Sequence, residues 1–254
     1  LRWDHPDMPW DATELRLGTL AEGRVTEWTT IAGGPGESVL QPEWTGDDEL
    51  IFTSDESGRW NLRRWSGSGI QDLLPADADT GGPLWNLGIR WFVPLPDGRI
   101  LAVRTNGADD LVIVDPASGD VRAIAAPISS RVLLDDVHGS RVLLRGAGAT
   151  TLGGLYVIDV AARDPALRLV RGTVDEDPDA AWLPIARAVS VDGPHGVVHA
   201  FAYPPTNPAH TAPDDEQPPY LVLAHGGPTS HVSGGASLDV AFFTSRGIGV
   251  LDVN

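Results

Sequence analysis

The 254-residue chain is long enough for one large domain or two ordinary ones, and its 42% hydrophobic and 21% charged residues are typical of a folded globular protein. Its net charge of −17 argues against a nucleic-acid partner, since phosphate backbones are bound by clustered positive charge. No apolar run approaches the roughly 18 residues of a membrane span. No signal-like segment opens the chain, and because residue 1 is Leu we expect any targeting signal to lie upstream. We expect no membrane partner and a cytoplasmic location.

Cysteine is absent, which excludes disulfides and thiolate metal sites within the chain. Residues 77–81, DADTG, resemble the opening of a calcium loop. They lack the third ligand position and the closing Glu of the helix-flanked form, so a solvated turn is the favoured interpretation. We therefore expect no metal and no cofactor.

Strand-like segments recur along the first two thirds of the chain. Four of them combine a strand-like run, a Gly- or Asp-bearing turn and a second strand-like run, in residues 12–31, 59–74, 109–125 and 153–170. The leucines that anchor these units, Leu15, Leu62, Leu111 and Leu155, lie 47, 49 and 44 residues apart. A period of about 40 to 50 residues built from short strands is typical of β-propeller blades.

The sequence between these units completes the pattern. Further strand candidates lie before the anchor leucines, and some of these are preceded by a candidate for the innermost strand of the blade. They occupy residues 41–48, 48–60, 89–98, 97–109 and 139–153. The sequence thus predicts a partial all-β propeller of about 3–4 blades, made of three whole blades and the tail of a fourth. Since a complete ring has about four to eight blades, we expect further blades before Leu1.

Large aromatic residues recur through these blades, at Trp44, Trp60, Trp65, Trp85 and Trp91. They could form a ligand cage. Packing between blades is the favoured interpretation, because aromatic residues that appear once per blade usually fill the space between neighbouring sheets.

The repeat ends near Gly172, and a different pattern follows. Residues 173–184 are acidic and contain proline, as in a linker. Strand candidates then lie at 188–193, 197–205, 220–227 and 248–254, with a short helix over 238–247 that ends at Gly247. The strand at 220–227 is nearly all apolar, as in a strand covered on both faces. A strand, a helix and a second strand predict a parallel α/β sheet. We therefore divide the chain into a propeller part (1–172), a linker (173–184) and an α/β domain (185–254).

The strand candidate at 220–227 runs into two adjacent glycines and a proline, in the sequence LVLAHGGPTS of residues 221–230. Glycine accepts backbone angles closed to other residues and lets another group approach the main chain. A glycine pair at the end of a strand therefore indicates exposed N–H groups that bind a negatively charged oxygen.

Four stretches resemble the prolyl oligopeptidase family of serine peptidases, within its acylaminoacyl-peptidase and dipeptidyl-aminopeptidase branch. They are WDHPDMPWD at 3–11, residues 41–62, GGPLW at 81–85 and the run from 218 to 254. The likeness covers nearly the whole chain. HGGP alone also occurs in esterases, whereas HGGPTS after several blades is a specific combination.

The resemblance implies a β-propeller followed by the first strands and helix of an α/β-hydrolase domain, in which the propeller restricts access to short peptides. Short peptides are then the substrates, cleaved by a Ser that is activated by His and oriented by Asp. Carried over by motif, Gly227 donates an oxyanion-hole N–H and Gly226 provides clearance, while His225 and Pro228 fix the turn.

The nucleophile itself is not in this chain, because no serine between Ser38 and Ser245 fits the G-x-S-x-G pattern. In this fold Ser, Asp and His follow the oxyanion strand in that order, so we expect all three beyond Asn254 and expect the chain alone to be inactive. The remaining candidate side chains are interpreted as surface groups: His138, His231, Asp214, Asp215 and Glu216. Asp252 and Asn254 lie where active-site loops start in α/β folds.

Two other functions stay open. One is a non-catalytic propeller that binds a partner, with the glycines as a structural turn, and the other is an esterase on the same scaffold. Incomplete sheets leave strand edges unpaired, so we also expect copies of the chain to associate, as homo-oligomers or aggregates.

Overall fold

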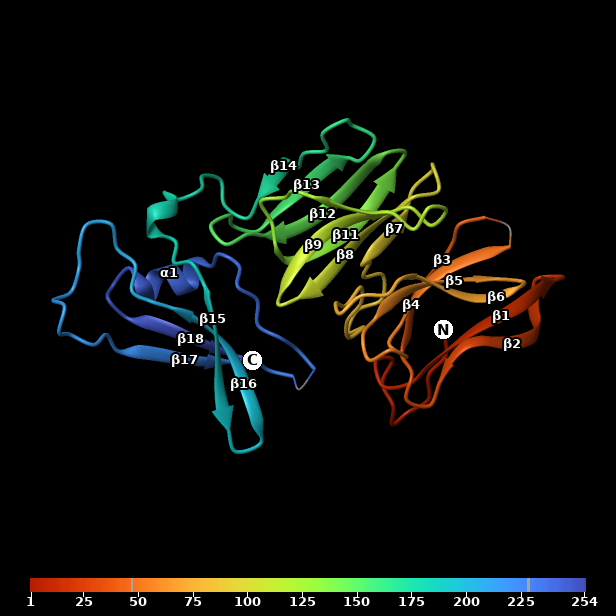
Figure 1. Cartoon of the computed structure of the whole chain (residues 1–254), viewed down its shortest axis with the longest axis horizontal. Helices are drawn as coiled ribbons and strands as arrows, with labels where there is room; N and C mark the ends of the chain where they lie inside the picture. Colours follow the sequence, from red (N-terminus) through yellow and green to blue (C-terminus); the bar gives the residue numbers. More distant parts are fainter. Residues whose placement is uncertain (47, 228) are drawn as a thin grey trace.

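Residues 1–46, 48–227 and 229–254 are described by the computed structural model, which arranges them as five sheets (Figure 1). A two-stranded sheet pairs β1 (Thr13–Ala21) with β2 (Arg24–Gly34). Three four-stranded sheets follow, each of antiparallel strands in sequence order. Their strands are β3 (Val39–Trp44), β4 (Glu49–Ser54), β5 (Asn61–Ser66), β6 (Gly69–Leu74), β7 (Phe92–Pro94), β8 (Ile100–Asn106), β9 (Ala108–Val114), β10 (Val121–Ile124), β11 (Ser130–His138), β12 (Arg141–Ala147), β13 (Gly154–Asp159) and β14 (Arg168–Gly172).

These sheets are the blades of a partial propeller, and the predicted repeat is confirmed. The anchor leucines lie on β1, β5, β9 and β13, in each unit on the strand that pairs with the last strand. Leu15, Leu62 and Leu111 are buried. Leu155 is only half-buried, because it lies with Val157 on the outer face of the last blade, whereas Tyr156 and Ile158 on the other face are in the core. A β-bulge in the pairing with β14 follows Leu155.

Neighbouring blades share buried apolar clusters. One cluster joins β1 to the sheet β3–β6 through Leu15 and Phe52. A second joins that sheet to β7–β10 through Leu62 and Phe92, and a third joins β7–β10 to β11–β14. The strands of this interior are apolar on both faces, since a blade between two others has no face toward water.

The predicted role of the tryptophans is correct for some and wrong for others. Trp65 packs against the cluster between the first two sheets, and Trp91 is buried. Trp44 and Trp85 are 53% and 54% exposed. Trp85 contacts Trp10 and the chain after the paired glycines, so it does not fill a space between blades.

The last sheet contains β15 (Arg187–Gly193), β16 (Gly196–Tyr203), β17 (Tyr220–Ala224) and β18 (Gly249–Val253), in the order β15-β16-β18-β17. The helix α1 (Leu238–Thr244) connects β17 to β18, and these two strands are parallel, as predicted. Ser237 caps the start of α1, and Gly247 follows its end with φ +82°. A 3₁₀ turn, Ala180–Trp182, lies in the stretch predicted as a linker.

Two expectations for this sheet are wrong. It is mixed and not wholly parallel, because Gly193 pairs with Gly196 across a two-residue hairpin that makes β15 and β16 antiparallel. The strand β17 is not covered on both faces, since Val222 is 62% and Leu223 38% exposed. It lies at the edge of the sheet, and α1 packs on the sheet through Val240 and Phe243.

None of the helices in the described parts of the chain is both long and apolar enough to span a membrane.

The cluster shared by the last two blades predicts a contrast between neighbouring leucines on β12. Leu144 is fully buried in it, whereas Leu143 is half-buried on the other face of the strand. Leu144→Ala should lower the free energy of unfolding by about 2–5 kcal/mol, because it removes apolar contacts and leaves a cavity. Leu143→Ala is the matched control and should lower the free energy of unfolding by clearly less. Urea unfolding of both variants measures the difference, and equal losses would contradict the assigned core.

Candidate functional site

The paired glycines directly follow the end of β17. Gly227 has φ +110°, a backbone angle that L-residues rarely adopt. Among the described residues, no atom lies within 4 Å of the place a Cβ on Gly226 would take, so none of them fills the space beside that residue. The strand therefore ends in a turn that requires glycine at 227 and leaves room for another molecule at 226.

The amides of both glycines are available. Gly226 and Gly227 are exposed, and among the described residues no acceptor takes a hydrogen bond from either N–H. Nδ1 of His225 donates to the carbonyl oxygen of Gly226 at 2.8 Å, since a carbonyl oxygen only accepts hydrogen bonds. Pro228, predicted to support the same turn, lies outside the described residues.

The carboxyl end of β18 lies beside this turn, because Ala224 of β17 pairs in parallel with Val253. Asp252 and Asn254 are thus brought to the edge where the sequence places them. The backbone N–H of Asn254 donates to the carbonyl oxygen of His199 at 2.8 Å, and its side-chain oxygen accepts from the backbone of Val232 at 3.0 Å. Asn254 therefore holds the chain that returns from the glycine turn.

Charged groups surround Asp252. Burial raises the pKa of its carboxyl, and the charges of Arg131 and His225 oppose that rise. The pKa of the Tyr203 hydroxyl is raised as well, by burial and by the negative charge of Asp252. Arg131 of the propeller and His225, just past the end of β17, favour the charged form of this carboxyl, but burial outweighs them.

The propeller contacts the chain after the glycines directly. Nε1 of Trp85 donates to the carbonyl oxygen of Thr229 at 2.9 Å, and Nε of Arg131 donates to the hydroxyl of Ser233 at 3.2 Å. Further along, the N–H of Ala236 donates to the carbonyl oxygen of Gly148 at 2.8 Å. The sequence did not predict these contacts of Trp85 and Arg131; the one available signal was the occurrence of Trp85 in the GGPLW stretch.

A Ser–His pair that the sequence reasoning also missed lies on the hairpin. The hydroxyl of Ser190 is 2.9 Å from Nδ1 of His199, its neighbour across the β15–β16 ladder. Both side chains are exposed, and within the described residues no carboxylate bonds the other ring nitrogen of His199. Without an orienting acid, this pair is a cross-strand contact.

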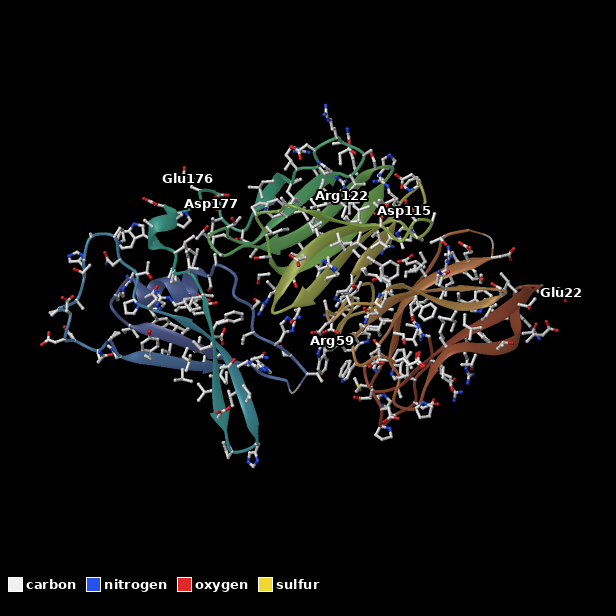
Figure 2. The ribbon with its side chains drawn as sticks, in the orientation of Figure 1. Glu22, Arg59, Asp115, Arg122, Glu176 and Asp177 are labelled. Atoms are coloured by element: carbon white, nitrogen blue, oxygen red, sulfur yellow. The ribbon has the colours of Figure 1, made fainter. Side chains whose placement is uncertain are left out.

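The remaining candidates lie on the surface. His138, His231 and the run 214–216 are exposed. Asp77 and Asp79, from the stretch resembling a calcium loop, each contact Arg59 at 3.0 Å. Figure 2 shows Arg59 at the edge of the N-terminal blades that faces the last sheet, and Glu22 at the tip of the β1–β2 hairpin at the opposite end. Among the described residues no group of His, Cys, Asp and Glu could hold a metal ion.

Two surface hollows also lie on the blades. One is on the outer strands of the last blade, lined by Arg141, Leu143, Val157, Asp159, Ala166, Arg168 and Val170, and the other lies between the first two sheets beside Trp44 and Trp65. Neither hollow is lined by the predicted site residues that the structure describes. The glycine turn is an exposed ledge that lies outside these two hollows.

The surroundings of Asp252 predict how stability changes with pH. A carboxyl whose pKa is raised in the folded state favours folding while it is protonated. This contribution to stability is lost as the pH rises from the ordinary pKa of the carboxyl, about 3.9, through its raised pKa in the folded state. Asp252→Asn should therefore be more stable than the unsubstituted chain at neutral pH and equal to it in acid. Asp97→Asn is the control of opposite sign, because Arg99 lowers the pKa of Asp97. Thermal unfolding across this pH range tests both variants. A lower stability of Asp252→Asn than of the unsubstituted chain at neutral pH would contradict the raised pKa of Asp252.

Comparison with known proteins places this edge in context. Neither the family models nor the curated proteins give a match to the sequence. Among solved structures, a puromycin-hydrolysing peptidase of Mycobacterium tuberculosis is 38% identical with a TM-score of 0.93, covering 100% of this chain and 39% of its own. A puromycin hydrolase is 41% identical with a TM-score of 0.90, over 99% of this chain and 38% of its own. The chain thus spans about two fifths of the length of these relatives.

More distant structures share the fold. Prolyl oligopeptidase B from Galerina marginata is 12% identical with a TM-score of 0.75, over 97% of this chain and 35% of its own. The order of blades followed by a sheet is therefore common to both groups of structures. From its fold, and from 38–41% identity over almost its whole length to puromycin-hydrolysing peptidases, the chain belongs to the prolyl oligopeptidase family.

Proposed function

We propose that the chain is a segment of a serine peptidase that hydrolyses short peptides and aminoacyl amides such as puromycin. In this proposal residues 1–172 are propeller, 173–184 link the two parts, and 185–254 begin the hydrolase domain. The observation that carries the proposal is the ledge after β17, where two exposed glycine amides lie beside the carboxyl end of a parallel neighbour. In α/β sheets, ligands bind at the carboxyl ends of the strands.

The chemistry assigned to this ledge is stabilisation of a negatively charged oxygen. When a serine attacks a carbonyl, the oxygen of the tetrahedral intermediate gains charge, and a fixed N–H is worth most at that moment. Gly227 is proposed as the donor, because it lies past the end of the strand ladder, is exposed, and donates its N–H to no acceptor among the described residues. Gly226 leaves space for the substrate, and His225 and Pro228 fix the turn between strand and glycines.

The catalytic residues are proposed to lie beyond Asn254, in the order Ser, Asp, His. The propeller would then limit access to short substrates. Support for the substrate class comes from relatives described as puromycin-hydrolysing, since puromycin contains an aminoacyl amide bond. Acylaminoacyl- and dipeptidyl-peptidase activities are the finer alternatives within the same proposal.

The direct test uses the protein that continues past residue 254. We expect a G-x-S-x-G within about 100 downstream residues, followed by Asp and His. That protein should be labelled by a serine-directed phosphonate, and should cleave puromycin, acyl-alanyl, dipeptidyl or prolyl chromogenic substrates. Absence of labelling together with tight binding of an intact partner would support the propeller binding module instead. Cleavage of esters only would support the esterase.

The role of the Gly227 amide is tested with a pair of variants of that longer protein. Gly227→Pro removes the N–H, whereas Gly227→Ala keeps it; both are strained at φ +110°. Turnover should fall about 10²-fold or more in Gly227→Pro, and clearly less in Gly227→Ala. Gly226→Ala is a further control. It should fold normally, because its Cβ would meet none of the described atoms within 4 Å, and it should raise KM by narrowing the approach of the substrate. Equal turnover in the Pro and Ala variants would remove Gly227 from the oxyanion role.

A further inference from the structure

Trp85 occupies an unusual position for a large aromatic residue on a propeller. Its side chain is 54% exposed, yet its indole nitrogen donates to the carbonyl oxygen of Thr229 at 2.9 Å, across 144 positions of sequence. Thr229 is two residues past Gly227. This bond therefore links the N-terminal blades to the chain that leaves the proposed oxyanion turn.

The ring of Trp85 is held from its own side. It lies against Trp10, with ring centroids 4.5 Å apart and a tilt of 45°. The residue before Trp10 is Pro9, whose buried carbonyl oxygen accepts a hydrogen bond from the hydroxyl of Ser38 at 2.9 Å and a further one from Thr13. Trp10 is thereby attached to the strands of the first two sheets, and Trp85 to Trp10.

The connection that leads from β6 to Trp85 is also fixed. Asp79 bonds Arg59 at 3.0 Å and exchanges two backbone hydrogen bonds with Thr105. The N–H of Thr80 donates to the carbonyl oxygen of Trp60 at 2.6 Å. Gly81 lies so close to the ring of Trp60 that a Cβ there would be 2.6 Å from it. The indole N–H of Trp85 therefore projects from a rigid base.

The receiving segment is fixed at further points. Ser233 accepts from Arg131, which holds a positive φ of +52° at a bulge in β11, and Val232 donates to Asn254. Of these bonds, the one from Trp85 is nearest in sequence to the glycines. Thr229 is only two residues from Gly227, so a displacement of Thr229 also moves Gly227. Val232 and Ser233 are farther from Gly227 in the chain.

We propose that Trp85 is a positioning residue: from the propeller, its indole N–H holds the carbonyl of Thr229 and thereby sets the position of the Gly227 amide. This rests on the proposed oxyanion role of Gly227. The propeller then contributes to catalysis itself, in addition to limiting access, because a donor gives full stabilisation only when it is already oriented toward the developing charge.

The first experiment is independent of catalysis. Trp85→Phe keeps a ring against Trp10 but removes the donor. In this chain, amide exchange of residues 226–233 should become about fivefold faster, the factor expected for one ordinary hydrogen bond. Trp28→Phe, an exposed tryptophan on the outer strand β2, is the matched control and should leave exchange in this segment unchanged. Unchanged exchange in Trp85→Phe would overturn the proposal.

The second experiment measures catalysis in the longer protein. Trp85→Phe should lower kcat about tenfold at constant KM, since an oxyanion contact is made in the transition state and not with the bound substrate. A rise in KM at constant kcat would overturn the positioning role and indicate that the ring contacts substrate. An inactive unsubstituted protein would refute the proposed function, while amide exchange still decides whether Trp85 holds Thr229.

A second variant guards against a general loss of folding in Trp85→Phe. Trp10→Phe disturbs the same aromatic pair but keeps the indole donor of Trp85. Measured below both unfolding midpoints, its exchange in residues 226–233 should stay near that of the unsubstituted chain. Exchange as fast as in Trp85→Phe would assign the effect to the aromatic pair and overturn the role of the N–H.

Discussion

Burial of apolar surface between consecutive blades is the interaction on which the rest of the structure depends. A blade with neighbours on both sides is apolar on both faces, so it is stable only while both remain in contact. Phe52 and Phe92 are fully buried in the clusters that join the first three sheets. The loops that carry Trp10 and Trp85 are attached to these sheets, and Arg131 to the next. The geometry at the glycine turn thus depends on packing far from it.

The repeat and the secondary elements of the second part could be predicted from the sequence because their signals are local. Strand length, turn residues and the recurring leucines mark each blade, and Gly247 marks the end of α1. The bulge after Leu155 was missed, since pairing register depends on the partner strand. The exposure of β17 was missed for a related reason: an apolar run shows that a strand suits burial but not which elements cover it.

The candidate site divides in the same way. The turn at Gly227 could be predicted, because a glycine pair after an apolar strand reflects a backbone requirement of those residues themselves. The contacts of Trp85 and Arg131 join positions 144 and 102 residues apart, and no local pattern encodes them. Tryptophans of similar spacing pack in the interior, as Trp65 and Trp91 do, so the spacing alone did not distinguish Trp85 from them.

The shared clusters also determine how the propeller part loses structure. Since each cluster joins only adjacent sheets, cooperativity is nearly one-dimensional, as in repeat proteins. Among the described residues, β2 is largely exposed and β1 shares a buried cluster with one sheet, so the β1–β2 ribbon has fewer buried contacts than the blades that follow it. Because Trp10 directly precedes that ribbon, any loosening of the ribbon reaches the support of the distant turn without first disturbing the interior.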